Sequence, residues 1–194
     1  INTFELPNNT SWQDSIQTLT LKDQEGKDDL VNSKSFKPFK KSHNIRTISI
    51  HSKRGKDTVM INSKFIPKTA TKMAVKTGKG EDQIRLEGAY NSLIKAGPGI
   101  DVIEAGKGNN RVHAGPGDDI ISAGGGQNIF IGGPGRDTFK INGELLVRGM
   151  ITYQIQDFQL DKDLLSLTPD MDESQLFIKK GELFYADQSL GFIA

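Results

Sequence analysis

An apolar residue recurs about every nine positions between residues 77 and 140, and glycine-rich or polar sequence separates each one from the next. The residues beside it alternate in direction, as in a strand with one buried face. The pattern therefore predicts a series of very short strands, each pointing one apolar side chain inward. The predicted inward positions are Ile84, Ile94, Ile103, Val112, Ile121, Phe130 and Phe139.

Glycines fill the intervals between these strands, and 17 of the 21 lie between residues 77 and 149. Five abutting nonapeptides occupy residues 96–104, 105–113, 114–122, 123–131 and 132–140. Two less regular copies precede them at 77–85 and 87–95, with Leu86 one residue out of step. Glycine adopts backbone angles that are closed to other residues, so each block predicts a sharp turn followed by a strand. Stacked blocks of this kind predict an all-β parallel solenoid.

The sixth position of each block alternates between aspartate and a neutral residue. Along the chain it holds Asp82, Ser92, Asp101, Asn110, Asp119, Asn128 and Asp137. Two nonapeptides complete one coil, so residues 18 apart stack on the same edge at the strand separation of about 4.8 Å. All four aspartates are therefore predicted on one edge of the solenoid, and the neutral residues on the other.

Acidic side chains held this close repel one another unless a cation lies between them. Ca²⁺ binds in cages of carboxylate and backbone carbonyl oxygens, so the aspartate edge predicts about three Ca²⁺ sites, one in each gap of the column. The gap between Asp82 and Asp101 is the least regular, because Leu86 lengthens that spacing to 19 residues. The candidate metal-site residues are the aspartates Asp82, Asp101, Asp119 and Asp137 and the glycines of their turns, Gly78, Gly80, Gly97, Gly99, Gly115, Gly117, Gly133 and Gly135.

The opposite edge predicts no metal. The carboxamides of Asn110 and Asn128 both donate and accept hydrogen bonds, so they can stack as a ladder without an ion. Asp118, beside the predicted sites, is assigned to the solvated surface.

The blocks resemble the GGxGxDxUx nonapeptide of RTX, or hemolysin-type calcium-binding, proteins. The resemblance implies a parallel β-roll from a secreted bacterial protein such as a toxin, adhesin or exoenzyme. It also implies export through type I secretion machinery, folding on Ca²⁺ binding outside the cell, and attachment to other domains of a larger parent protein. The family pattern has aspartates on both edges, and this chain departs from it at Ser92, Asn110 and Asn128.

The flanking segments divide the chain into three predicted parts. Residues 1–76 are predicted as a β-rich segment whose degenerate turns, at Asp28 and Asp57, bind no calcium because Lys27 and Lys56 adjoin them. The RTX β-roll covers residues 77–141. Residues 142–194 are predicted to cap the roll, with an antiparallel hairpin over 174–186 about a Lys180-Gly181 turn, and Asp157, Phe158 and Asp163 resemble the segment that follows RTX arrays.

Composition and charge exclude several functional classes. The chain has no cysteine, which removes disulfide scaffolds and thiol chemistry, and no apolar run long enough to span a membrane. Sequence motifs of hydrolases and nucleotide-binding enzymes are absent and the three histidines lie far apart, so no enzymatic activity is expected. The net charge of +1 is unevenly distributed. Residues 1–80 have 15 basic and 7 acidic residues, a net charge of +8, and residues 81–194 have 10 basic and 17 acidic residues, a net charge of −7. Because the lysines are scattered, no nucleic-acid partner is expected.

Two functions remain open from the sequence. The first is a secreted or cell-surface calcium-binding module that folds outside the cell and stabilises its parent protein. The second is an adhesive module in which calcium is only structural. Its ligand would be a glycan, a host-cell surface or a partner protein. The binding surface would be the Asn edge, the outward apolar positions or the lysines between Lys34 and Lys41.

Overall fold

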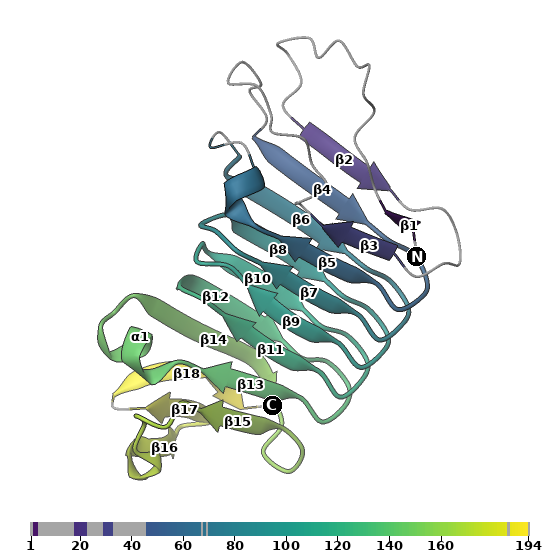
Figure 1. Ribbon diagram of the computed structural model, residues 1–194. Helices are drawn as coiled ribbons and strands as arrows, with labels where there is room; N and C mark the ends of the chain where they lie inside the picture. The colour runs from purple at the N-terminus through teal and green to yellow at the C-terminus, as the bar shows by residue number, and fades with distance from the viewer. Residues whose placement is uncertain are drawn as a thin grey trace.

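The chain winds into a roll of two parallel β-sheets that face each other across an apolar core (Figure 1). The computed structural model describes residues 2–3, 18–22, 29–32, 46–66, 68, 70–185 and 187–193. Successive strands alternate between the two sheets, so each coil contributes one strand to each of them. The predicted all-β solenoid is confirmed.

The first sheet has eight strands in the order β1-β3-β5-β7-β9-β11-β13-β15, and its neighbouring strands are parallel. Its strands are β1 (Asn2–Thr3), β3 (Asp29–Asn32), β5 (Thr58–Ile61), β7 (Gln83–Leu86), β9 (Val102–Ala105), β11 (Ile120–Ala123), β13 (Thr138–Ile141) and β15 (Leu164–Leu167). The pairs β9–β11 and β11–β13 join residues 18 apart, for example Ile121 beside Ile103, whereas β7 and β9 join residues 19 apart because Leu86 adds one residue.

The second sheet has ten strands in the order β16-β17-β18-β14-β12-β10-β8-β6-β4-β2. From β2 to β14 its pairs are parallel. The strands are β2 (Thr18–Lys22), β4 (Thr47–His51), β6 (Lys72–Lys76), β8 (Asn91–Lys95), β10 (Asn110–His113), β12 (Gly126–Ile131), β14 (Ile151–Phe158), β16 (Leu176–Lys179), β17 (Glu182–Tyr185) and β18 (Gln188–Ile193).

Short helices occupy the connections that are longer than a tight turn. The 3-10 helix η2 (Ser63–Phe65) lies between β5 and β6, α1 (Gly143–Val147) between β13 and β14, and η3 (Glu173–Gln175) before β16. The side chain of Asn142 accepts a hydrogen bond from the Leu145 amide and so caps the N-terminus of α1. In the described part of the chain, no helix has the length and apolar character needed to cross a bilayer.

The core follows the inward positions that the nine-residue period predicts. All seven predicted inward residues are at most 1% exposed, from Ile84 through Phe139. Upstream, Ile48, Ile50 and Val59 continue the same core, because β4 and β5 pair with β6 and β7 in the same two sheets. The sheets thus pass residue 77 without interruption, and the division of the chain at that residue remains a prediction.

The C-terminal cap contains the predicted antiparallel hairpin. Strands β16 and β17 pair antiparallel, and Lys180 and Gly181 form the turn with φ values of 53° and 74°. The hairpin does not pair directly with the last coil, however, because β18 lies between them, antiparallel to β17 and parallel to β14. Strand β18 therefore supplies the hydrogen-bond partners for the edge of β14, and the hairpin of β16 and β17 pairs with β18 instead.

Aromatic side chains close the core at this end. The rings of Phe130 and Phe139 stack with centroids 6.3 Å apart, Tyr153 approaches Phe130 at 5.8 Å, and Phe158 approaches Phe139 at 6.0 Å. Such pairs add to the burial energy of the rings, so the last coils and β14 form one packed unit.

Candidate metal centre

The four predicted aspartates stack in one column, each immediately before a strand of the first sheet. The register places Val102 beside Gln83 and Ile120 beside both Val102 and Thr138, so the residues that precede them lie level. Asp82 is 2% exposed, and Asp101, Asp119 and Asp137 are fully buried. The sequence placed these residues correctly, while their binding of metal remains a prediction.

A ladder of hydrogen bonds joins the column. The backbone amide of each aspartate donates to Oδ1 of the aspartate one coil further along the chain. The distances are 2.8 Å from Asp82 N to Asp101 Oδ1, 2.7 Å from Asp101 N to Asp119 Oδ1, and 2.9 Å from Asp119 N to Asp137 Oδ1. Each carboxylate therefore reaches back into the gap that separates its own turn from the preceding one.

The second carboxylate oxygen has no such partner. In the described structure, Oδ2 of Asp101, Asp119 and Asp137 is buried and accepts no hydrogen bond. A buried carboxylate is costly unless it is paired, neutralised or bound to a metal. Each of these three stacked carboxylates has a hydrogen bond to one oxygen only, so a cation along this edge would stabilise them.

The raised pKa values of the column show that its aspartates are costly to ionise without a cation. Burial, together with the negative charges of Asp119 and Asp82, raises the pKa of Asp101 to about 7, although the hydrogen bond from the Asp82 amide opposes the shift. Burial likewise raises the pKa of Asp119 to about 6 and that of Asp137 to about 7. Burial also raises the pKa of Asp82, although the Asp57 amide and the Thr77 hydroxyl oppose it.

Glycine backbone brings the turns of this edge into close contact. An ideal Cβ on Gly117 would lie 1.7 Å from the carbonyl oxygen of Gly99, and the φ of Gly117 is +146°. The carbonyl of one turn thus faces the Cα of the next at a distance that only glycine permits. All eight predicted glycines have φ between 105° and 151°, namely Gly78, Gly80, Gly97, Gly99, Gly115, Gly117, Gly133 and Gly135.

These oxygens fit an ion that prefers hard oxygen ligands. Among the described residues, no group of three or more His, Cys, Asp or Glu side chains is clustered as a metal site. A metal in any one gap of this edge would therefore be held by the carboxylates that border that gap, among Asp101, Asp119 and Asp137, together with backbone carbonyls of the facing glycine turns. Ca²⁺ accepts such mixed sets of carboxylate and carbonyl oxygens, whereas softer metals require nitrogen or sulfur.

The neutral edge has a ladder that needs no ion, as the sequence predicts. Asn110 pairs with Asn128 in register, and Asn110 Nδ2 donates to Asn128 Oδ1 at 2.8 Å. Asn128 Nδ2 in turn donates to the carbonyls of Gly125 and Gly126 at 3.0 and 3.1 Å. The amide hydrogens occupy the place that a cation would have to take, although Asn110 Oδ1 is buried without a partner.

Replacing Asn128 with aspartate is expected to destabilise the roll. The carboxylate would lose the donors that Nδ2 supplies and would face the carbonyls of Gly125, Gly126 and Thr152. A buried charge that faces acceptors costs about 2 to 3 kcal/mol. Thermal unfolding in excess calcium measures the change.

The matched control for that substitution is Asn109→Asp. Asn109 is exposed, and its Oδ1 accepts the Gln127 amide at 2.9 Å, a bond that a carboxylate keeps. This variant should stay within about 0.5 kcal/mol of the parent. Equal loss in the two variants, or a metal bound between the turns of Asn110 and Asn128, would contradict the assignment of calcium to one edge.

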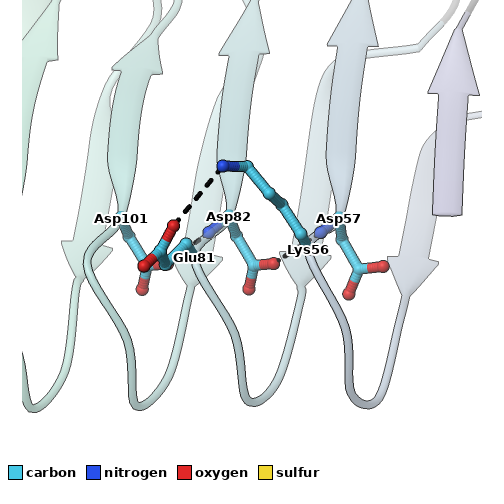
Figure 2. A network of polar contacts seen from close by, with 5 residues as sticks. All are labelled: Lys56, Asp57, Glu81, Asp82 and Asp101. Carbon is cyan, nitrogen blue, oxygen red and sulfur yellow. Dashed lines mark hydrogen bonds and ion pairs between the residues drawn. The ribbon is translucent and has the colours of Figure 1, made fainter. Parts of the chain in front are cut away.

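The column extends one coil upstream to Asp57, which the sequence placed among degenerate turns (Figure 2). The Asp57 amide donates to Asp82 Oδ1 at 2.8 Å, and Asp57 is fully buried. Lys56, which was expected to offset Asp57, forms an ion pair with Glu81 at 3.4 Å across the same two turns. Absence of calcium at this turn stays a prediction, and Lys27 and Asp28 lie outside the described residues.

The column ends downstream at Asp163, whose role the sequence did not specify. Asp163 Oδ1 accepts the Asp137 amide at 3.0 Å, and Oδ2 accepts the Gln159 amide at 2.8 Å. Asp157 binds the neighbouring turn in a similar way, with its two oxygens on the amides of Gly132 and Gly133. Backbone donors thus satisfy the carboxylates of the capping segment.

Asp118 lies beside the column and outside it. The side chain is exposed, and its Oδ1 accepts the Arg136 amide at 2.9 Å, so it stabilises the surface of the turn.

Two facing parallel sheets with buried carboxylates and left-handed glycines along one edge define a β-roll of the calcium-binding class. A family model described as the RTX calcium-binding nonapeptide repeat (four copies) matches residues 88–121, 96–130 and 106–139, so the chain carries RTX repeats of the hemolysin-type family. Comparison with curated proteins and with solved structures gave no match. The RTX repeats that the sequence predicts are confirmed over these residues, and they identify this part of the chain as a calcium-binding β-roll module.

Proposed function

We propose that the chain is a folding switch in which Ca²⁺ fills the gaps of the aspartate column and so completes the roll. The observation that carries the proposal is the unpartnered, buried Oδ2 of Asp101, Asp119 and Asp137. Without the ion, three stacked carboxylates and a glycine-rich backbone favour the unfolded chain. With it, the free energy of metal binding becomes free energy of folding. About three sites are expected, one in each gap between Asp82 and Asp137.

A switch of this kind suits a protein that is exported before it folds. Proteins with RTX repeats are typically secreted. Extracellular calcium modules work with dissociation constants of about 10⁻⁴ to 10⁻³ M, a level that the cytosol does not reach. We infer that the chain leaves the cell through type I secretion machinery and orders outside, where it stabilises the domains attached to it. We assign the module itself no catalytic role.

A circular-dichroism titration tests the switch. The chain is freed of calcium with EDTA and then titrated to millimolar Ca²⁺, with Mg²⁺ as the matched control ion. We expect weak β-structure in the chelator and a cooperative gain with Ca²⁺, and a much smaller response to Mg²⁺, which requires an octahedral set of ligands. Identical spectra in EDTA and in millimolar Ca²⁺ would show that the ion does not drive folding.

Acidic pH should partly replace calcium. In the folded state the pKa values of Asp101, Asp119 and Asp137 are about 7, 6 and 7, against an ordinary value of 3.8, so between pH 4 and 7 the folded state binds more protons than the unfolded state. The calcium-free fold therefore gains stability as pH falls through this window, by about 1.4 kcal/mol per unit of pKa difference and per group at most.

The measurement compares two pH values. In calcium-free buffer, the β-structure seen by circular dichroism should be greater at pH 5 than at pH 8. Because protons and Ca²⁺ compete for the same oxygens, the calcium midpoint should be higher at pH 6 than at pH 8. A midpoint and a calcium-free spectrum that do not change over this range would contradict the assignment of the buried carboxylates as the titrating groups.

The adhesive alternative depends on a surface that a ligand recognises. The lysines between Lys34 and Lys41, which the sequence offered for that role, lie outside the described residues. Outward apolar residues such as Leu93 and Val102 are exposed on the two sheets, at 42% and 39%. These residues alone do not specify a ligand, so the switch is the function that the described geometry favours.

A further inference from the structure

A basic groove lies where the strands of the second sheet enter the turns of the aspartate edge. Its volume is about 400 Å³, and residues from three successive coils line it. Backbone of Gly78 and Gly97 contributes to its lining beside Pro98. Five cationic side chains line it, namely Lys53, Arg54, Lys76, Lys79 and Lys95.

The strand register arranges these cations in rows along the roll. His51, Lys76, Lys95 and His113 lie level at the ends of β4, β6, β8 and β10. Three of them are exposed and His113 is half-buried. Arg54 lies beside Lys79 in a parallel bridge, which forms a second row in the turns. Successive cations in a row are therefore separated by one strand spacing, about 4.8 Å.

In the part of the chain that the structure describes, no acidic side chain forms an ion pair with Arg54, Lys76, Lys79 or Lys95. Among the described residues that line it, none is an aspartate or glutamate. The nearby Glu81 forms an ion pair with Lys56. At the end of the row, burial and the positive charges of Arg111 and Lys95 lower the pKa of His113, although the negative charge of Asp157 opposes the shift. The groove is thus a positive surface, and four of its five cations lie in residues 1–80, whose net charge is +8.

We propose that this groove binds a linear anionic polysaccharide lying along the roll, with one acidic sugar facing each coil. A pyranose ring advances a glycan chain by about one strand spacing, so carboxylates or sulfates on successive sugars meet successive cations. Lysine ammonium groups recognise such anions as point charges. The described lining has no aromatic side chain, on which the bases of a single-stranded nucleic acid would stack. The groove adjoins the candidate metal site at the turns of Gly78 and Gly97, but the proposed binding uses the lysine rows and not the aspartate column.

The test uses the full chain at saturating calcium and a heparin hexasaccharide as the probe, with binding measured by calorimetry. The variant Lys76→Gln, Lys79→Gln, Lys95→Gln removes three cations from the groove. The matched variant Lys107→Gln, Lys140→Gln, Lys162→Gln removes three exposed cations elsewhere on the roll. We expect the groove variant to bind the probe at least about tenfold more weakly than the parent, and the matched variant to lose less than about threefold.

Further measurements make the result decisive. In saturating calcium, circular dichroism should give the same folded spectrum for both variants and the parent, which separates loss of binding from loss of the fold. The neutral maltohexaose should not bind, and added salt should weaken binding of the heparin probe. Equal affinity of the two variants would overturn the proposal. So would tighter binding of a single-stranded oligonucleotide of equal charge or of vesicles containing phosphatidylserine, because each would identify a different partner.

Discussion

Replacing Asp119 with asparagine is expected to raise the calcium concentration at the folding midpoint by at least about tenfold, since the charge of the ligand set controls calcium affinity. The substitution is nearly isosteric. Asparagine keeps an Oδ1 that accepts the Asp101 amide, a bond of 2.7 Å in the parent. What is lost is the negative charge of a fully buried residue in the middle of the column. The loss should reach both adjoining gaps, so the titration should also become less cooperative.

Asp118→Asn is the matched control for Asp119→Asn. It removes the same charge one residue away, but from an exposed side chain whose Oδ1 accepts the Arg136 amide. The amide oxygen of asparagine can accept the same bond, so the calcium midpoint should change by less than about twofold, the scale of a weak surface interaction. If both variants shift the midpoint equally, the effect belongs to general charge and the column does not bind the ion.

Replacing Gly117 with alanine is expected to be among the most damaging single changes in the repeats. Its Cβ would lie 1.7 Å from the Gly99 carbonyl oxygen, in a backbone conformation with φ of +146° that other residues rarely adopt. Relief requires the two coils to separate, which disrupts the ladder between Asp101 and Asp119. We expect a loss of at least about 3 kcal/mol in the free energy of unfolding, measured by chemical denaturation in excess calcium.

Gly124→Ala makes the same chemical change on the opposite edge. There the new Cβ would lie 3.4 Å from Lys107 Cγ, an ordinary contact, and the backbone has no positive φ. The variant should unfold within about 1 kcal/mol of the parent, because alanine also restricts the unfolded chain. Similar losses at Gly117 and Gly124 would mean that the close approach of the turns on the aspartate edge contributes little to stability.

The nine-residue period was sufficient to predict most of the fold and of the candidate site. A fixed repeat determines which side chains point inward and which stack, so the buried row from Ile84 to Phe139 follows from spacing alone. The same repeat places the aspartates on one edge of the roll and Asn110 and Asn128 on the other. Since the asparagines carry both donors and acceptors, their ladder could be predicted without coordinates, and the bond from Asn110 to Asn128 confirms it.

The ends of the column escaped prediction because insertions break the period. Asp57 and Asp82 are 25 residues apart, and the connection between their strands contains η2. Asp137 and Asp163 are 26 residues apart, with α1 in the connection between β13 and β14. Both insertions add chain away from the aspartate edge, so the column stays in register in space while its spacing in the sequence changes.

The basic groove also has no signature in the sequence. Lys53, Lys76, Lys79 and Lys95 are irregularly spaced along the chain and appear as scattered surface charges. Only the pairing of β4, β6 and β8 aligns them. A surface that forms across several coils depends on how strands from those coils pair. The lengths of the connections between these strands vary, so the sequence alone does not show which residues lie side by side.

The occupied oxygens of Asp163 have a consequence for how such rolls associate. Both accept amides from the chain itself, so the aspartate column ends on a carboxylate that already has a donor on each oxygen. The column therefore has a fixed end within each molecule, whereas a column that ended on unpaired oxygens could accept the backbone amides of a coil from a second copy.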